Sequence, residues 1–257
     1  MGLNELFCGE DKAAVYFSGG IDSLVMLHYL QPVHKRLVVF YRDTGAAFPH
    51  VREFVFDCLA KYNLEYQIVS GGCDVMQLHR AVGLPADIVP MNNHPVILES
   101  KEQTSAPKFI PWVECCRAVI WDPLWNAVVE SGLKVILRGQ KLCDGLKGTP
   151  DGSEQDGITV RHPLNHWTDE DVKRYARDNQ LQLPEQYKTI KDSLDCHCCT
   201  APLFGGIGKA QARLDFMKEN YPLQYASLIK KLESLHTCSM AATLELGELL
   251  EGRCELH

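Results

Sequence analysis

The sequence lacks any apolar run of about eighteen residues, the length that a helix needs to cross a membrane. It also lacks a hydrophobic signal core, because its first residues lead into Asp and Lys. Internal repeats and low-complexity tracts are missing as well. We therefore expect a soluble, cytoplasmic protein without a membrane partner.

Positive charge is in short supply, with 26 Lys and Arg against 33 Asp and Glu, so the formal net charge is −7. This balance argues weakly against a nucleic-acid partner held by general electrostatic attraction, although a small basic patch is compatible with it. Apolar residues are plentiful: 46% of the 257 residues are hydrophobic, enough for one large core with or without a helical appendage. The composition leaves the oligomeric state open, including a homo-oligomer.

Strand-like and helical patterns alternate along most of the chain. The predicted strands are residues 14–17, 37–41, 66–69, 135–138 and 159–162. With helical segments between them, this order is typical of an α/β fold with a doubly wound, mainly parallel sheet covered on both faces. We predict a nucleotide-binding catalytic domain at 1–207 and a helical C-terminal extension and tail at 208–257, with helices at 210–220, 222–235 and 241–250. Repeated prolines between Leu84 and Pro111 predict one long irregular segment near the site.

The first predicted strand runs directly into Ser18-Gly19-Gly20-Ile21-Asp22-Ser23 and then into a helix. The glycines let the backbone approach a ligand closely, the N–H groups of the turn point inward, and the helix N-terminus adds positive potential. The hydroxyls of Ser18 and Ser23 can add donors. The full string after a strand predicts a phosphate-binding loop, whereas a lone Gly-Gly pair is more often a plain turn.

This string resembles the PP-loop of ATP pyrophosphatases, sulfate adenylyltransferase small subunits and nucleotidyl-sulfate reductases. In those families the next strand ends in Asp-Thr-Gly, and here the strand at 37–41 is followed by Arg42 and then Asp43-Thr44-Gly45. Ligands of open α/β sheets bind at the carboxyl ends of the strands. We therefore expect this second motif to line an adenine-nucleotide pocket.

Two further segments continue the resemblance. Arg138-Gly139-Gln140-Lys141 resembles the strand-then-Arg element that reads phosphate or sulfate, where Arg offers a bidentate fork. Residues 162–172 resemble a Pro-Leu-x-x-Trp-Thr-x-x-Asp-Val segment, which is at least half structural because Thr168 can cap a helix. By this resemblance the nucleotide is bound by Ser18, Gly19, Gly20, Asp22, Ser23, Asp43, Thr44, Gly45, Arg138, Gln140 and Lys141.

Eleven cysteines are a high and odd count, and a reducing compartment argues against a disulfide framework. Cys115-Cys116 precedes Pro123-Leu124, and Cys196-His197-Cys198-Cys199-Thr200 follows much later. An adjacent pair plus a Cys-x-x-Cys pair supplies four thiolates, the number that a [4Fe–4S] cluster requires. A tetrahedral zinc site could use the same sulfurs or His197. Adjacent cysteines favour iron–sulfur over zinc.

Adenylyl-sulfate reductases carry a similar Cys-Cys-Arg, Pro-Leu and Cys-x-x-Cys-Thr spacing. The chain is thus similar to the adenylyl-sulfate/phosphoadenylyl-sulfate (APS/PAPS) reductase family. That resemblance implies that Cys115, Cys116, Cys196 and Cys199 hold the cluster, and it leaves the role of Cys198 open.

The sequence ends in Arg253-Cys254-Glu255-Leu256-His257, similar to the terminal Glu-Cys-Gly-Leu/Ile-His of these reductases. In that family the tail thiolate attacks the sulfate sulfur, which implies that Cys254 is catalytic. Arg253 and His257 can lower its pKa and favour the thiolate. The implied partners are APS or PAPS and a thioredoxin- or glutaredoxin-type reductant.

Two other functions stay open. The intact Ser-Gly-Gly-x-Asp-Ser loop also suits ATP-dependent adenylation followed by sulfur transfer, as in tRNA thiolases or DNA phosphorothioation proteins, because many reductases carry a degenerate loop. The third is a nucleotide or cluster sensor without turnover, which predicts a dispensable Cys254.

Overall fold

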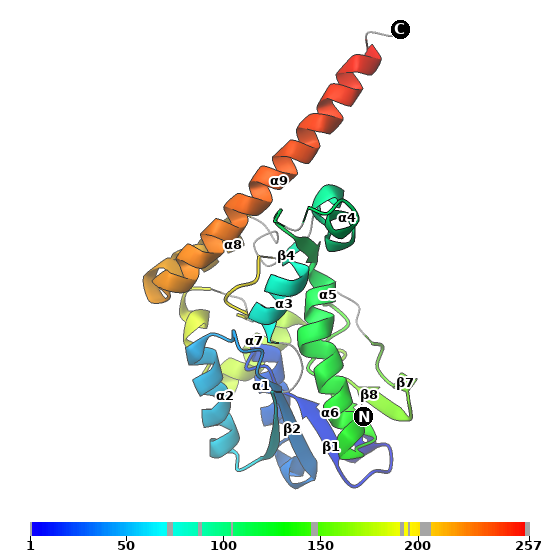
Figure 1. Cartoon of the computed structure of the whole chain (residues 1–257). Coiled ribbons are helices and arrows are strands. Elements are labelled where there is room, and N and C mark those ends of the chain that lie inside the picture. Colours follow the sequence, from blue (N-terminus) through cyan, green and yellow to red (C-terminus); the bar gives the residue numbers. More distant parts are fainter. Residues whose placement is uncertain are drawn as a thin grey trace. The chain divides into compact units, whose positions relative to one another are not determined.

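A computed structural model describes residues 2–70, 74–86, 89–103, 105–144, 149–190, 193–194, 196–200 and 207–254, with only the backbone at 207 and 245–254 (Figure 1). The chain divides into two compact units. Unit 1 comprises Met1–Gly72 and Ile120–Asp195, and unit 2 comprises Cys73–Val119 and Cys196–His257. The predicted boundary at residue 207 stays a prediction.

Unit 1 is built on a six-stranded sheet in the order β3-β2-β1-β6-β8-β7. Its strands are β1 (Ala13–Tyr16), β2 (Leu37–Arg42), β3 (Glu65–Val69), β6 (Val135–Leu137), β7 (Glu154–Gln155) and β8 (Ile158–Arg161). All neighbouring strands pair in parallel except β7 with β8. The predicted doubly wound, mainly parallel sheet is confirmed.

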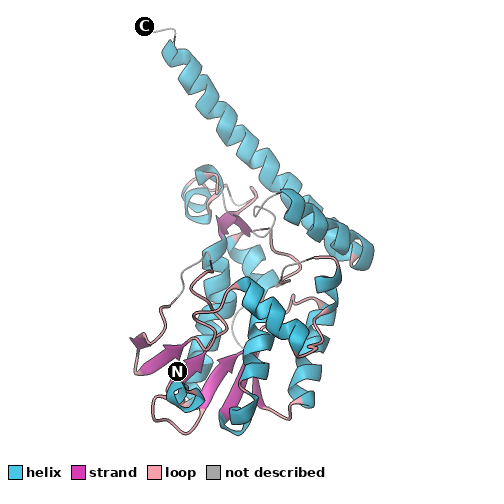
Figure 2. Cartoon of the chain, turned by 180° about the vertical axis from the view of Figure 1, so that it is seen from behind, coloured by secondary structure: helices cyan, strands magenta, loops and turns pink. Residues whose placement is uncertain are grey.

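Helices pack on both faces of this sheet (Figure 2). The first face carries α1 (Ile21–Tyr29), α2 (Pro49–Lys61) and α7 (Asp169–Asp178), with Val15 and Leu27 fully buried. The second face carries α6 (Asp122–Ser131), beside Ala14 and Ile136. Each buried Leu or Ile stabilises the fold by about 1.5–3 kcal/mol. The central strands are apolar on both faces because helices cover both faces of the sheet.

The strand order makes β1 a switch point. From β1 the sheet continues through β2 and β3 in one direction, and through β6 and β8 in the other. Ligands of open parallel sheets bind at the carboxyl ends of the strands where the order reverses. The carboxyl ends of β1, β2 and β6 therefore form the expected binding edge.

Unit 2 combines short elements with two long helices. Its elements are α3 (Val75–Val82), β4 (Leu84–Ala86), α4 (Pro95–Ser100), β5 (Phe109–Pro111), α5 (Trp112–Cys116), α8 (Ile207–Asn220) and α9 (Pro222–Cys254). β4 and β5 pair in parallel, and Ala86 and Phe109 pack with Leu235 of α9. A π-helical turn, Arg117–Trp121, leads from α5 into α6. One 3-10 turn, Met91–Asn93, lies in unit 2. The other described 3-10 turns, Leu3–Phe7, Gln31–Arg36 and Glu185–Lys188, lie in unit 1.

The prediction of one irregular segment between Leu84 and Pro111 is wrong, because this stretch contains β4, α4 and β5. Its prolines occupy positions that need no backbone N–H donor. Pro95 stands in the first turn of α4, where helical N–H groups have no intrahelical partner. Pro85 and Pro111 lie in a sheet of only two strands, where a missing donor is tolerated.

The predicted helical C-terminal region is confirmed, with a different division. The sequence predicts helices at 222–235 and 241–250, and α9 runs through both without a break for 33 residues, about 50 Å. Neither Gly nor Pro separates the two predicted segments. Leu228 and Leu235 are buried, whereas residues 241–244 are exposed. None of the described helices combines the length and apolar character needed to span a membrane.

Candidate functional site

The predicted phosphate loop joins the carboxyl end of β1 to the first turn of α1. Ser18 Oγ lies 3.2 Å from Ser23 Oγ and accepts a hydrogen bond from the N–H of Gly20. Ser23 Oγ donates to the carbonyl of Gly20 at 2.9 Å. Gly20 is the N-cap of α1 in extended conformation, and it supplies no side-chain cap to the helix. Gly20 therefore contributes no side chain that would compete with an anion for the N–H groups of the helix N-terminus.

Glycines set the shape of this loop at two places. Gly19 has a φ of +81°, and a Cβ there would lie 2.9 Å from Cγ2 of Val55 on α2. A Cβ on Gly139, after β6, would meet the backbone of Asp22 and Ser23 at 3.1 Å. The β6 end and the first turn of α1 thus touch through backbone. The sequence analysis did not predict Gly139 as a site residue, although it lies within the motif Arg138-Gly139-Gln140-Lys141.

We expect Gly19→Ala to destabilise the protein and Gly20→Ala to leave it folded. The left-handed backbone at Gly19 costs a side chain about 1–2 kcal/mol, and overpacking against Val55 adds about 1–3 kcal/mol. The nearest atom to a Cβ on Gly20 is Ser18 Oγ at 3.4 Å, an ordinary contact. Gly20→Ala should instead weaken nucleotide binding about tenfold, because its Cβ narrows the approach of a phosphate. Denaturant unfolding and calorimetry measure both effects, and an unchanged stability of Gly19→Ala would contradict the first.

The Asp43-Thr44-Gly45 motif forms a turn after β2 that side-chain hydrogen bonds hold in place. Asp43 Oδ1 accepts from the N–H of Gly45 at 3.1 Å, and Oδ2 accepts from Arg52 Nε at 3.0 Å. Thr44 is buried, and its Oγ1 accepts from the N–H of Ala46. Gly45 has a φ of +76°, a conformation that favours glycine. The turn lies at the predicted binding edge in one defined conformation, and Arg52 is a partner that the sequence did not reveal.

Lys141 is buried beside the phosphate loop. Its Nζ lies 2.7 Å from Asp22 Oδ1, 3.0 Å from Asp144 Oδ1 and 3.4 Å from Asp169 Oδ1. Burial lowers the pKa of Lys141, but the hydrogen bonds and charges of Asp22 and Asp144 outweigh it, and the net pKa is raised. The ammonium thus holds the Asp22 carboxylate at the start of α1 through an ion pair. The predicted direct contact of Lys141 with the nucleotide stays a prediction.

The remaining nucleotide candidates follow β6. Arg138 comes directly after the strand and its backbone N–H donates to the carbonyl of Arg161 at 3.0 Å. Its side chain is half-buried, and burial lowers the pKa of its guanidinium, which stays cationic near neutral pH. Gln140 is also half-buried. Tyr187, which the sequence did not single out, accepts from the N–H of Ile21 at 3.0 Å.

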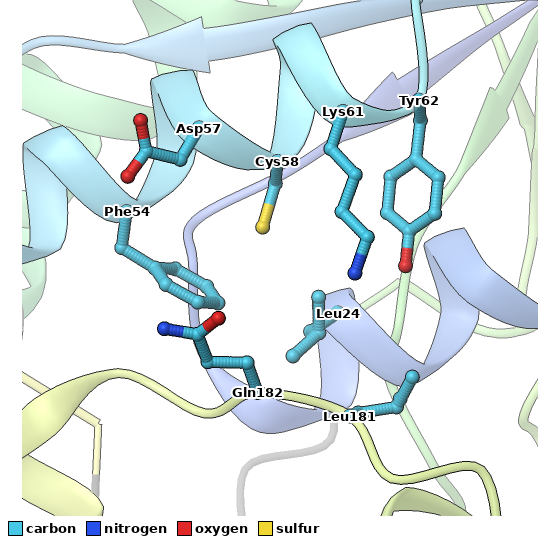
Figure 3. Close-up of a pocket in the computed structure, with 8 residues that line it drawn as sticks. All are labelled: Leu24, Phe54, Asp57, Cys58, Lys61, Tyr62, Leu181 and Gln182. Atoms are coloured by element: carbon cyan, nitrogen blue, oxygen red, sulfur yellow. The ribbon is translucent and has the colours of Figure 1, made fainter.

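Figure 3 shows a separate cavity in unit 1, on the side of α2. Its volume is about 60 Å³, and it is lined by Leu24, Phe54, Asp57, Cys58, Lys61, Tyr62, Leu181 and Gln182. Sites for drug-sized ligands are typically about 300–1,000 Å³, so this space holds a few waters and no nucleotide. Burial raises the pKa of Cys58 to about 11, which leaves its thiol protonated and unreactive at neutral pH.

All four predicted cluster ligands belong to unit 2. Cys115 and Cys196 are buried, and Cys116 and Cys199 are half-buried. The N–H of Cys199 donates to the carbonyl of Cys196 at 3.2 Å, which folds the second pair into a turn. Thr200, just after that turn, donates to the carbonyl of Pro85 in β4.

Basic side chains bind the backbone of the second pair. Arg213 Nη2 donates to the carbonyl of Cys196 at 3.1 Å, and Lys231 Nζ to that of Cys198 at 3.5 Å. Two cations beside a thiolate-rich turn suit an anionic group. Among the described residues, only Cys143, Asp144 and Asp169 place three ligand atoms within 4.8 Å of one another. Both the [4Fe–4S] cluster and a tetrahedral zinc site on these four sulfurs therefore stay predictions.

His79 of α3 is a neighbour of this cysteine group that the sequence did not reveal. Its Nε2 lies 3.4 Å from Cys115 Sγ. The ring is buried, and its Nδ1 has no hydrogen-bond partner among the described residues. Burial lowers the pKa of His79 to about 4, so the ring is neutral at pH 7. A neutral imidazole can donate one N–H to a thiolate.

Cys254 is the last residue of α9. Its side chain and that of Arg253 lie outside the described part of the chain, and so do Glu255, Leu256 and His257. The role of Cys254 therefore stays a prediction.

Residues 12–87 match the family model of the phosphoadenosine phosphosulfate reductase domain. This segment contains β1, the phosphate loop, β2 and the Asp43 turn. Over this segment the chain is similar to the APS/PAPS reductase family. A PAPS reductase of Vibrio cholerae serotype O1 is 25% identical over 172 residues, which are 67% of this chain. The match spans 61% of that relative, so the chain covers about three fifths of the curated relatives it matches.

A solved structure of a PAPS reductase has a similar fold. The PAPS reductase from Candida auris, a phosphate complex, has a TM-score of 0.52 at 19% identity, covering 78% of this chain and 91% of its own. The U34-tRNA thiolase NcsA from Methanococcus maripaludis, solved with its [4Fe–4S] cluster, has a TM-score of 0.43 at 16% identity over 91% of this chain and 76% of its own.

Proposed function

We propose that this protein is a member of the APS/PAPS reductase family and reduces a nucleotidyl sulfate to sulfite. The observation that carries the proposal is the family-matched segment itself, which forms a phosphate loop and the Asp43 turn at the switch point of the sheet. The loop glycines and the N-terminus of α1 suit the phosphate of an adenine nucleotide. Arg138 adds a cation at the end of the neighbouring strand.

The proposed reaction runs in two sulfur-transfer steps. The Cys254 thiolate attacks the sulfate sulfur, an S–S bond forms, the S–O bond to the phosphate breaks, and AMP or its 3′-phosphorylated form leaves. A thioredoxin- or glutaredoxin-type dithiol then attacks Cys254 Sγ, and sulfite departs with the electron pair of the S–S bond. Its second thiol resolves the mixed disulfide and restores the Cys254 thiol. The dithiol is oxidised by two electrons as sulfur passes from sulfate to sulfite.

In this proposal Cys115, Cys116, Cys196 and Cys199 of unit 2 would hold a [4Fe–4S] cluster. The donor set is four thiolates, with Arg213 and Lys231 at the backbone of the second pair to balance negative charge. His79 can donate its Nε2–H to the thiolate of Cys115 and so orient it. When bound, the cluster supplies a structural link and a local charge; the electrons come from the dithiol.

Anaerobically purified protein should be brown and contain about four irons per chain. Cys115→Ser or Cys199→Ser should remove the iron and the visible absorption, because each variant lacks one of the thiolate ligands. Cys8→Ser, an exposed thiol of unit 1, is the matched control and should keep both. Metal analysis and absorption spectra measure the result. Stoichiometric zinc without iron would contradict the cluster and favour the zinc alternative.

The second candidate is an ATP-dependent adenylating enzyme that transfers sulfur, and the intact Ser18-Gly19-Gly20-Ile21-Asp22-Ser23 loop is the observation that favours it. Anaerobic incubation with APS, PAPS or ATP separates the candidates. A reductase releases sulfite and the adenosine phosphate from one of the first two nucleotides when a dithiol is present. An adenylating enzyme releases pyrophosphate from ATP with an acceptor present, and a sensor turns over none of them.

A further inference from the structure

The strand β3 forms one edge of the six-stranded sheet of unit 1. In the order β3-β2-β1-β6-β8-β7 it has β2 on one side and no described strand on the other. The side chains from Glu65 to Ile68 are exposed, and only that of Val69 is buried. Tyr66 is 49% exposed and Ile68 is 38% exposed, which is unusual for large apolar side chains. An open edge of this kind is a template for another strand.

The backbone groups of Tyr66 and Ile68 point out of the sheet. Val69 pairs with Arg42 of β2, and its carbonyl accepts from the N–H of Asp43 at 3.2 Å, so the backbone of Val69 faces β2. Successive residues of a strand direct their N–H and C=O groups to opposite sides. The backbones of Tyr66 and Ile68 therefore face the open side, where no described residue pairs with them.

The sequence of β3 lacks the usual protection of an edge strand. Residues 65–69 contain no Pro, Gly or Lys, and the pairing with β2 runs over five consecutive residues without a bulge. The Tyr66 ring lies 6.4 Å from that of Phe56 on α2, which identifies the face that carries it. Ile68 shares this face because side chains alternate along a strand. Aromatic and β-branched side chains on one face favour pairing with a further strand.

We propose that β3 pairs antiparallel with β3 of a second copy of this chain, centred on Gln67. In this register Tyr66 of each copy lies opposite Ile68 of the other. Both residues direct their N–H and C=O groups outward, so each opposed pair exchanges two hydrogen bonds. An aromatic side chain opposite a β-branched one is also a favourable cross-strand pair. The two sheets become one continuous sheet.

The strand is its own complement, which favours a second copy over a strand of another protein. A two-fold axis at Gln67 brings the two side-chain amides together, and each amide can donate and accept. Glu65 falls opposite Val69 of the second copy, so no like charges face each other across the pair. Two five-residue strands make a small interface, and the dissociation constant should be micromolar or weaker.

Sedimentation velocity at rising protein concentration tests the dimer. Wild type should pass from monomer to dimer, and Ile68→Lys should weaken association about tenfold or more, because lysine on an edge strand opposes pairing. Val129→Lys is the matched control, since Val129 is an exposed residue of α6 in the same unit, and it should associate as wild type does. Both substitutions lie at exposed positions, so both variants should keep the circular dichroism spectrum and thermal midpoint of wild type.

A disulfide tests the register. Gln67→Cys places two thiols at the two-fold axis, in a pair without mutual hydrogen bonds whose Cα atoms lie about 4.5 Å apart, a separation that a disulfide spans. Mild oxidation should give a covalent dimer, with the bond mapped between the two substituted positions by peptide mass spectrometry. Glu65→Cys is the control: its two thiols would lie four residues apart along the strands, roughly 14 Å, and should form no such bond.

Three results would overturn the pairing. Wild type that is monomeric at every concentration would exclude the second copy as the occupant and leave the edge to a strand of another protein. A wild-type dimer that Ile68→Lys does not weaken would place the interface elsewhere. A dimer that Ile68→Lys weakens, but in which Gln67→Cys forms no mapped bond, would reject the antiparallel register centred on Gln67.

Discussion

Cys254→Ser should abolish sulfite formation while nucleotide affinity and iron content stay at wild-type levels. A serine hydroxyl has no accessible anionic form at neutral pH, whereas a thiol ionises readily and is a strong nucleophile. Cys254 ends α9, and the described side chains at 241–244 before it are exposed, so the substitution should cost little folding stability. The expected loss is therefore chemical.

Mass spectrometry sharpens this result. Wild type mixed with the sulfonucleotide in the absence of a dithiol should gain a sulfonate on Cys254, and the Ser variant should gain none. Cys238→Ser changes a half-buried thiol of the same helix and should leave sulfite formation intact. Full activity of Cys254→Ser with either sulfonucleotide would remove the tail from the mechanism and make the ATP-dependent alternative the better one.

The sheet of unit 1 was predictable because its strands are short apolar runs bounded by recognisable turn motifs. Residues 37–41 lead into Asp43-Thr44-Gly45, and residues 14–17 lead into the phosphate loop, so a strand and its functional turn are adjacent in sequence. Parallel pairing then places both turns at one edge. These parts of the site depend on local sequence and on one topological rule.

The missed parts depend on contacts between distant positions. Asp169 reaches Lys141 from α7, and Tyr187 meets the first turn of α1 only after the chain has folded. His79 and Cys115 lie on different short helices of unit 2. None of these residues belongs to a spaced motif with its partner, so the sequence pattern carried no signal for the pairing.

Lys141→Met should destabilise the protein at pH 7 and weaken nucleotide binding at least tenfold. The substitution keeps the length of the side chain but removes the only cation that contacts Asp22, Asp144 and Asp169 among the described residues. Breaking a buried ion network costs about 3–5 kcal/mol, and the partial exposure of the carboxylates places this case near the lower value. Asp22, in the first turn of α1 next to the phosphate loop, would lose the ion pair that holds its carboxylate in place.

The pH dependence of the free energy of unfolding of Lys141→Met shows why this variant is less stable. Burial raises the pKa of Asp22 in the wild-type protein, and loss of the ammonium should raise it further through the neighbouring carboxylates. A folded-state pKa above the unfolded value makes the native state bind more protons, so the stability of the variant rises as pH falls toward that pKa. The stability gap to wild type should therefore narrow between pH 7 and pH 5 in denaturant titrations. Lys12→Met, which breaks the exposed pair with Glu65 at 2.6 Å, should cost at most about 1 kcal/mol. A gap that is constant across this pH range would mean that lost packing, rather than carboxylate repulsion, destabilises Lys141→Met.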